Sequence, residues 1–238
     1  LMPWQYRDYC PNGLQVEGRT EIQKIVTGVT ASQALIDAAI KEKADALLVH
    51  HGYFWKGESQ PITGMKKNRI KALLENDINL YAYHLPLDAH PQLGNNAQLA
   101  ALLGIEGNES LENGNPNSVL RSGHFPNGIA PKALIERITQ VLDRKPMTEL
   151  SGPSEIHSVA WCTGGGQSYI EQAALKGIDA FITGEVSEQT IHTAREMGIH
   201  FFSAGHHATE RYGAKALGEH LAQELGLEVK FVDIPNPV

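Results

Sequence analysis

Apolar residues early in the chain alternate between short continuous runs and helical repeats. Residues 22–29 ("IQKIVTGV") and 45–51 ("DALLVHH") are runs typical of buried strands, whereas residues 31–44 repeat apolar side chains at helical spacing. The same criteria predict a third strand that runs into a loop over 78–88, and helices over 69–77, 95–104 (closed by Gly104) and 130–143. Strands alternating with helices indicate an α/β protein with mainly parallel or mixed sheets.

The pattern of residues 22–51 recurs at 156–185, which suggests an internal duplication. Residues 78–84 align in turn with 199–205. The identical pairs in the first alignment are Gln33 and Gln167, Ile36 and Ile170, Ala39 and Ala173, Asp45 and Asp179, and Ala46 and Ala180. We expect two duplicated α/β halves, with chance similarity between two βαβ units as the alternative.

The halves are expected at residues 1–104 and 129–238. Residues 105–128 are rich in Gly, Asn and Pro, which predicts a linker or insert with one short strand or hairpin. Ligands of parallel α/β sheets bind beyond the carboxyl ends of the strands. Two related halves could therefore bring their strand ends to one cleft.

Composition narrows the class of protein. The net charge of −7 argues against nucleic acid as the main partner, and the 42% hydrophobic content is typical of a globular protein. Cys10 and Cys162 show no CxxC spacing, so we expect neither a disulfide framework nor a cysteine zinc site, and a reduced cytosol is the default. No apolar run reaches the ~18 residues of a membrane span, and no signal peptide is visible.

Two adjacent histidines, His50 and His51, end the second predicted strand. A single histidine after a strand is more often structural than a ligand. Neighbouring side chains on a strand point to opposite faces, so two imidazoles at a strand end could address two separate metal ions. By itself, this pattern leaves the structural and the metal-binding interpretations balanced.

Two further segments carry metal-ligand types. The segment "HLPLDAH" (84–90) offers His84 and Asp88, although Asp88 could equally cap the following turn. The segment "GHHATER" (205–211) places His206 and Glu210 on one helical face, one turn apart. An exposed helix start is the alternative interpretation, since glutamate is favourable in a first helical turn.

Together the three segments supply at least three histidines and two carboxylates. Nitrogen and oxygen ligands without thiolate suit Zn, Mn, Fe, Co or Ni. Five protein ligands are too few to saturate two ions, so positions would remain for water. Two divalent metal ions ~3.5–4 Å apart could share and activate a hydroxide at neutral pH.

The segment "CTGGGQS" (162–168) lies between a predicted strand and a predicted helix. A glycine loop at that place can bind phosphate through backbone N–H groups. This one lacks the lysine of a P-loop, so a plain tight turn is the better interpretation. Glu185 in "TGE" could support a metal ligand, take part in acid–base chemistry or be an ordinary surface residue.

These segments resemble the Nif-three-like family, which is also catalogued as GTP cyclohydrolase 1 type 2 homologues. The resemblance rests on "PNGLQVEG", "ADALLVHHG", "YAYHLPLDAH", "NNAQLAALLG", "AWCTGGGQS", "DAFITGE" and "AGHHATER", and it is least clear over about 105–155. The beginning of the chain looks truncated relative to the family. The resemblance implies two intertwined halves related by duplication, a dinuclear metal site between them and a ring-shaped homohexamer.

Five positions match the metal ligands of that family. By this resemblance, His51 and Asp88 would serve one ion, His50 and His206 the other, and Glu210 would bridge the two. The resemblance also implies hydrolysis of a nucleotide-like small molecule, with GTP ring opening as a special case.

The leading hypothesis is therefore a cytoplasmic dinuclear-metal hydrolase in which Glu185 or His84 moves protons. The alternative is a metal-containing binding or regulatory scaffold without turnover. A DNA-binding protein is disfavoured, because the chain has no basic stripe.

Overall fold

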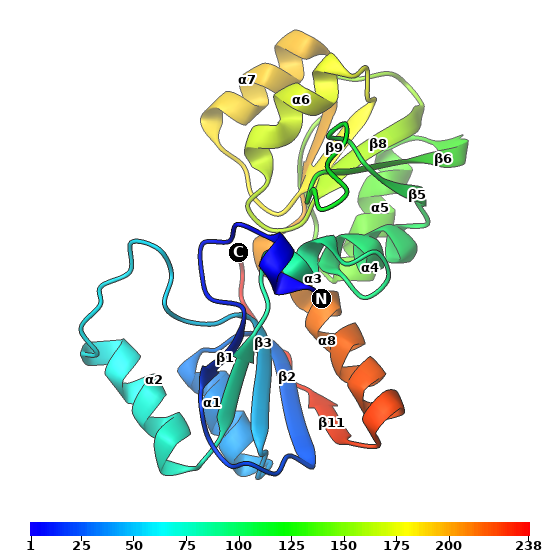
Figure 1. Cartoon of the computed structure of the whole chain (residues 1–238). Helices are drawn as coiled ribbons and strands as arrows, with labels where there is room; N and C mark the ends of the chain where they lie inside the picture. Colours follow the sequence, from blue (N-terminus) through cyan, green and yellow to red (C-terminus); the bar gives the residue numbers. More distant parts are fainter. The chain divides into compact units, whose positions relative to one another are not determined.

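The computed structural model describes residues 1–238, which form two compact units interleaved along the chain (Figure 1). Unit 1 comprises Leu1–Leu87 and Arg211–Pro235, and unit 2 comprises Asp88–Glu210 and Asn236–Val238. The chain passes between units within helix α3 (Leu85–Ala89) and within helix α8 (His206–Leu225). The halves expected at residues 1–104 and 129–238 follow the sequence duplication and stay a prediction.

The sheet of unit 1 has five strands in the order β1-β4-β3-β2-β11. Its strands β2, β3, β4 and β11 are parallel, and only β1 runs antiparallel, beside β4. The elements of this unit are the 3₁₀ turn η1 (Pro3–Gln5), β1 (Gly13–Val16), β2 (Lys24–Thr30), α1 (Gln33–Lys41), β3 (Ala46–His51), α2 (Gly64–Glu75), β4 (Asn79–Ala82) and β11 (Glu228–Phe231).

Helices cover both faces of the β2 half of this sheet. Leu35 and Ile36 of α1 pack against Val26 and other strand residues in one buried apolar cluster. α8 lies on the opposite face, where a Cβ at Gly218 would approach Thr27 Cγ2 to 2.8 Å. The parallel strands β2 and β3 are therefore buried as continuous apolar runs, which is the pattern that predicted them from the sequence.

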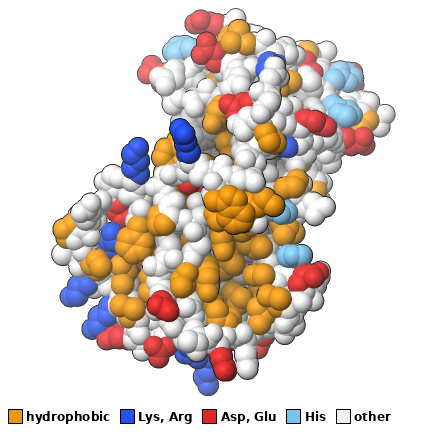
Figure 2. Space-filling view, in the orientation of Figure 1, with side chains coloured by type: hydrophobic (Ala, Val, Ile, Leu, Met, Phe, Trp, Pro, Cys, Tyr) orange, Lys and Arg blue, Asp and Glu red, His pale blue; other side chains and the backbone are white.

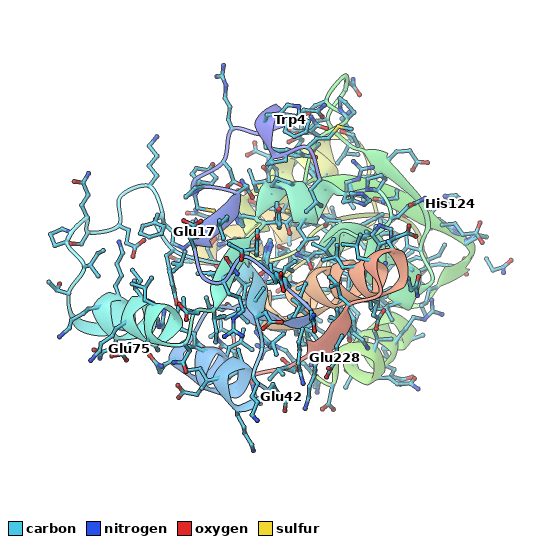
Figure 3. All side chains as sticks on the ribbon, turned by 60° about the horizontal axis from the view of Figure 1, so that its bottom comes forward. Trp4, Glu17, Glu42, Glu75, His124 and Glu228 are labelled. Atoms are coloured by element: carbon cyan, nitrogen blue, oxygen red, sulfur yellow. The ribbon has the colours of Figure 1, made fainter.

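The same face is open beyond α8. Figure 2 shows hydrophobic side chains gathered over this part of unit 1, and an apolar groove of about 620 Å³ lies there. Its lining includes Ile25, Leu48 and Tyr81 of the sheet together with Leu221 of α8 and Trp4. Trp4 is labelled in Figure 3 and is 79% exposed. One face of this parallel sheet is thus only partly covered.

Ion pairs tie β11 to the edge of this sheet. Lys24 on β2 contacts Glu228 on β11 at 2.7 Å, and Lys230 on β11 contacts Glu42, after α1, at 2.7 Å. Figure 3 labels both glutamates on the same side of unit 1. These charges are exposed to solvent, so they orient the last strand more than they stabilise it.

The sheet of unit 2 has six strands in the order β5-β6-β8-β9-β10-β7. Its centre, β8-β9-β10, is parallel, whereas β5, β6 and β7 pair antiparallel. The elements are α4 (Asn95–Leu103), β5 (Glu106–Ser110), β6 (Arg121–Ile129), α5 (Pro131–Leu142), β7 (Met147–Glu149), β8 (Ile156–Cys162), η2 (Gln167–Tyr169), α6 (Ile170–Leu175), β9 (Ala180–Thr183), α7 (Glu188–Met197) and β10 (His200–Ser203).

Two helical layers bury this second sheet. α6 and α7 pack on each other in Figure 1, and Ile170 and Ala194 join Phe181 and Phe201 in one apolar cluster. α4 packs against α5, and the Trp161 indole on β8 donates a hydrogen bond to a carbonyl in α4. Both faces are covered, as a sheet with a parallel centre requires.

The two sheets repeat one topology, β2-α1-β3-α2-β4 in unit 1 and β8-α6-β9-α7-β10 in unit 2. One pair of aligned residues, Asp45 and Asp179, also makes equivalent hydrogen bonds. Asp45 accepts hydrogen bonds from the backbone N–H groups of Gln23 and Lys24, while Asp179 accepts them from the N–H groups of residues 157 and 158. The register of the predicted duplication is therefore reproduced in the hydrogen bonding.

Several local predictions differ from the structure. The helix expected over 69–77 is α2, which spans Gly64–Glu75. The third strand stops at Ala82, and the segment expected as a loop contains the short helix α3. The hairpin offered as one alternative for the insert at 105–128 is confirmed: β5 and β6 pair there and add two strands to the second sheet. Helix α4 ends before Gly104 as predicted, and no helix is long and apolar enough to cross a membrane.

Candidate metal centre

Three histidines gather at the carboxyl ends of neighbouring strands in unit 1. His50 and His51 end β3, and His84 follows β4, which pairs with β3. The ring centroids of His50 and His51 are 4.4 Å apart with planes inclined by 45°. The centroid of His84 lies 5.1 Å from that of His50 and 5.9 Å from that of His51. The two adjacent rings therefore lie close together with inclined planes, and a third ring joins them. That each serves a different ion stays a prediction.

Neighbouring groups fix the ring orientation of His50 and His51. Nδ1 of His50 lies 2.9 Å from the carbonyl oxygen of Tyr83. A carbonyl only accepts, so neutral His50 carries its proton on Nδ1 and its lone pair on Nε2, the arrangement that a metal ligand needs. Nδ1 of His51 lies 3.1 Å from Thr30 Oγ1. His50 is fully buried, so solvent does not compete for its hydrogen bond to the Tyr83 carbonyl oxygen.

A buried carboxylate holds His84. Nδ1 of His84 lies 2.6 Å from Asp8 Oδ1, and the other Asp8 oxygen accepts hydrogen bonds from Asn12 Nδ2 and the Leu85 N–H. Burial alone would raise the pKa of Asp8, but these hydrogen bonds, led by that of His84, lower the pKa to about 2. Asp8 is therefore ionised and presents Nε2 of His84 to the histidine cluster.

These three histidines could hold a metal ion, because one ligand nitrogen from each lies within 4.8 Å of the other two. The sequence offers His84 both as a metal-ligand type and as a proton carrier, but it gives no indication of Asp8 or Trp55. The indole of Trp55 stands edge-on to the His84 ring at 4.9 Å. "RDYCPNG" shows no ligand spacing, so no local signal could have identified Asp8.

In unit 2, Asp88 is buried in a polar frame. Its Oδ1 accepts hydrogen bonds from Asn95 Nδ2 at 2.9 Å and from Thr163 Oγ1 at 3.3 Å. Asn96 donates to the Asp88 carbonyl oxygen and accepts the Thr163 N–H. The carboxylate is 5% exposed and held by α4 and the loop after β8, so Asp88 does more than cap a turn.

His206 and Glu210 lie in the first turns of α8, one turn apart as predicted. Nε2 of His206 is 3.2 Å from Glu210 Oε2, and its Nδ1 is 2.7 Å from Glu185 Oε1. Burial alone would lower the pKa of His206, but the hydrogen bonds and charges of Glu210 and Glu185 raise the pKa to about 9. This side chain lies between two carboxylates that both favour a cationic partner.

The glycine loop after β8 lines this part of unit 2. Gly164 has φ +68°, and a Cβ there would lie 2.1 Å from Glu210 Oε1. The Gly164 N–H donates to Thr209 Oγ1, and the Gly166 N–H donates to Thr183 Oγ1. Because these N–H groups are already used, the loop fits the tight turn that the sequence favoured over a phosphate site.

Both cysteines favour the protonated thiol in the metal-free protein, although Cys10 Sγ lies within 4.8 Å of ligand atoms of Asp8 and His84. Burial, with the negative charge of Asp8 added, raises the pKa of Cys10 to about 12. Burial also raises the pKa of Cys162 well above its usual range, and the charges of Asp88 and Glu210 act in the same direction. The other donors in both units are imidazole nitrogens and carboxylate oxygens, which suit divalent cations such as Zn, Mn, Fe, Co or Ni.

The predicted residues thus divide between the units. Unit 1 contains His50, His51 and His84, and unit 2 contains the remaining candidates, Asp88, Glu185, His206 and Glu210. Each set lies at strand ends of a repeated α/β sheet. The fold and the donors define a class, the duplicated α/β proteins with clusters of histidine and carboxylate that could bind metal.

Comparison with known proteins names the family. The family model of Duf34/NIF3 (NGG1p interacting factor 3) matches residues 1–237, so the chain belongs to this family. A Vibrio cholerae protein named "GTP cyclohydrolase 1 type 2 homolog" is 62% identical over 240 residues, covering 100% of this chain and 95% of its own length. An Escherichia coli protein of the same name is 61% identical over 231 residues, covering 97% and 92%.

Solved structures agree on the fold. The structure titled "Structural genomics, protein ybgI, unknown function" has a TM-score of 0.95 and 59% identity, covering 99% of this chain and 94% of that one. A protein from Thermus thermophilus has a TM-score of 0.86 and 34% identity, covering 98% and 92%. The mixed α/β fold with two sheets is therefore the fold of this family.

Proposed function

We propose that this protein is a dinuclear metal-dependent hydrolase that acts on a nucleotide-like small molecule. The observation that carries the proposal is the histidine cluster of unit 1: the proposed ligands His50 and His51 lie together, and His84 places a ring nitrogen within 4.8 Å of theirs. Hydrogen bonds from neighbouring groups already orient these rings. Such outer partners are typical of metal-binding histidines.

The donor chemistry fits two divalent ions. In the proposed arrangement His51 and Asp88 hold one ion, His50 and His206 hold the other, and Glu210 bridges them. Asp88 and Glu210 are 5% and 2% exposed. Buried carboxylates of this kind are usually paired with cations or coordinate metals.

When bound, two such ions would supply Lewis-acid activation of water and stabilisation of developing negative charge. The residues of the chain do the rest in this proposal. Glu210 and Asp88 provide fixed negative charge, and His84 Nε2 exchanges a proton with the substrate or the leaving group. Asp8 keeps His84 in one ring orientation by accepting its Nδ1 proton in a hydrogen bond.

Nucleotide-like substrates follow from the relatives, several of which are named "GTP cyclohydrolase 1 type 2 homolog". In that special case water would add at C8 of the guanine ring, and the ring would open. We also propose that the chain assembles into a homohexamer and acts in the cytoplasm. Light scattering coupled to gel filtration tests the assembly, since a monomer would contradict it.

The test is a hydrolysis screen on protein reconstituted separately with Zn, Mn, Fe, Co and Ni. GTP, other nucleotides and phosphate esters are the substrates, and metal content is measured alongside. We expect about two ions per chain and turnover of at least one nucleotide. His51→Ala should lose one ion and the turnover without unfolding, because His51 ends β3 and lies outside the apolar core cluster of unit 1.

His124→Ala is the matched control, since His124 is exposed on β6 (Figure 3). It should keep both ions and full turnover. Turnover by a demonstrably metal-free protein would refute the mechanism. Two bound ions with no turnover on any substrate would favour a metal-containing binding or regulatory scaffold instead.

A further inference from the structure

We propose that Glu185 is a positioning residue: it holds the His206 ring so that Nε2 can bind a metal ion, and Gln167 in turn orients Glu185. This inference rests on the proposed function and deepens it. Glu185 lies two residues beyond the end of β9, and His206 begins α8. Both belong to unit 2, so the contacts that carry the inference lie within one compact unit.

The first contact fixes the histidine. Glu185 Oε1 lies 2.7 Å from His206 Nδ1, a charge-assisted hydrogen-bond distance. A carboxylate only accepts, so Nδ1 carries a proton, and Nε2 is the nitrogen at which a metal ion would replace the remaining proton. That nitrogen faces Glu210, whose Oε2 lies 3.2 Å away. The ring therefore has a defined back, Glu185, and a defined front, Glu210.

The second contact fixes Glu185. Its Oε2 accepts a hydrogen bond of 3.3 Å from Gln167 Nε2. Gln167 belongs to η2, directly after the glycine loop, and a Cβ at Gly165 would lie 3.7 Å from the Glu185 carboxylate. Both carboxylate oxygens are engaged by protein donors, and the loop packs beside them. This geometry favours a fixed orientation over a proton shuttle between solvent and substrate.

The duplication supports a site role for Glu185. The register that aligns Gln33 with Gln167 also aligns His51 with Glu185. His51 ends the second strand of its βαβαβ unit, and Glu185 lies two residues beyond the end of the equivalent strand, where ligands of such sheets bind. In unit 1 this place holds a proposed metal ligand, and in unit 2 it holds the carboxylate behind such a ligand. Outer partners of this kind typically change metal affinity by about 10–100-fold.

The experiment titrates Zn²⁺ into the full-length, metal-free protein in competition with a chromophoric chelator. The variants are Glu185→Gln, which keeps an acceptor without charge, and Glu185→Ala, which removes it. Glu188→Gln is the control, because Glu188 is exposed in the first turn of α7. A second readout is the low-field imidazole N–H resonance of His206, assigned by its loss in His206→Ala and followed with and without zinc.

We expect one of the two zinc affinities to fall about 10-fold in Glu185→Gln and up to about 100-fold in Glu185→Ala, with the other unchanged. The low-field resonance should disappear in Glu185→Ala and persist in Glu188→Gln. A higher zinc affinity in Glu185→Gln than in Glu185→Ala would separate loss of ring orientation from general disruption of the fold. Circular dichroism confirms folding, and if Glu185→Ala unfolds, Glu185→Gln alone carries the comparison.

Two failures are distinguishable. If the wild type binds two ions and Glu185→Ala binds both equally well, the positioning role is wrong while the dinuclear site stands. If the wild type does not bind two ions, the proposed function is wrong. The low-field resonance in metal-free protein then tests whether Glu185 orients His206. Its persistence in Glu185→Ala overturns the inference, and its loss supports Glu185 as the group that orients His206.

Discussion

Replacement of Gly164 by alanine is the sharpest test of how the glycine loop supports the proposed ligand Glu210. Gly164 has φ +68°, a conformation that costs an alanine about 1–2 kcal/mol. The added Cβ would lie 2.1 Å from Glu210 Oε1, whereas ordinary contacts begin at 3.4 Å. The oxygen must therefore move by roughly 1 Å, several times the tolerance of about 0.2 Å for a metal–ligand distance.

Two responses to this clash are open to the side chain. If Glu210 rotates away, the free energy of unfolding falls by the backbone cost of about 1–2 kcal/mol. If it stays, overpacking adds about 1–3 kcal/mol. Either response displaces or strains the carboxylate, so we expect zinc affinity to fall at least 10-fold in Gly164→Ala, by analogy with displaced ligand partners.

The assay pairs urea unfolding of metal-free protein with zinc titration. Gly165→Ala is the matched control, because its added Cβ would meet nothing closer than 3.7 Å and its φ is not in the left-handed region. That variant should resemble wild type in both measurements. If Gly164→Ala keeps wild-type stability and zinc affinity, the close packing of the loop on Glu210 is refuted.

Two further predictions concern carboxylates that hold the fold. The pKa of Asp8 is lowered from 3.8 to about 2, so its ionised form stabilises the folded protein above pH 4. About 2 kcal/mol of the free energy of unfolding is lost as the pH falls through 2. Urea unfolding of Asp8→Asn should lack this acid dependence, and an unchanged pH slope would contradict the prediction. Asp45→Ala and Asp179→Ala should each lower the free energy of unfolding by about 1–2 kcal/mol, because each removes hydrogen bonds from backbone N–H groups. The two losses should add in the double variant, since the residues share no partner. Thermal unfolding measures the losses, and a marked departure from additivity would count against independent roles.

Much of the fold could be predicted because its signals are local. The strands around Leu47 and Phe181 are continuous apolar runs, and the helices between them repeat at helical spacing. The register of the duplication was also predictable, because identical residues such as Asp45 and Asp179 align in the sequence. In the structure these two residues keep equivalent hydrogen-bonding roles. Short edge strands such as β1, β7 and β11 have only three or four residues, which is too little pattern to detect.

The candidate site was predictable only in part. The resemblance proposes five ligands, which end or follow a predicted strand or lie at the start of a predicted helix: His50, His51, Asp88, His206 and Glu210. Their assembly into one dinuclear site stays a prediction. The groups that orient them gave no comparable signal, because a hydrogen-bond acceptor can come from any part of the chain.

The sequence by itself determined the local elements, the repeat and the chemical types of the donors, because periodicity and residue type are properties of neighbouring positions. Tertiary structure decided the strand order, the antiparallel edges and the partner of each histidine. Asp8 and His84 meet across 76 residues, and Glu185 and His206 meet across 21. Such pairs form only when folding brings distant segments together. Only the tertiary structure therefore reveals which carboxylate orients each imidazole ring.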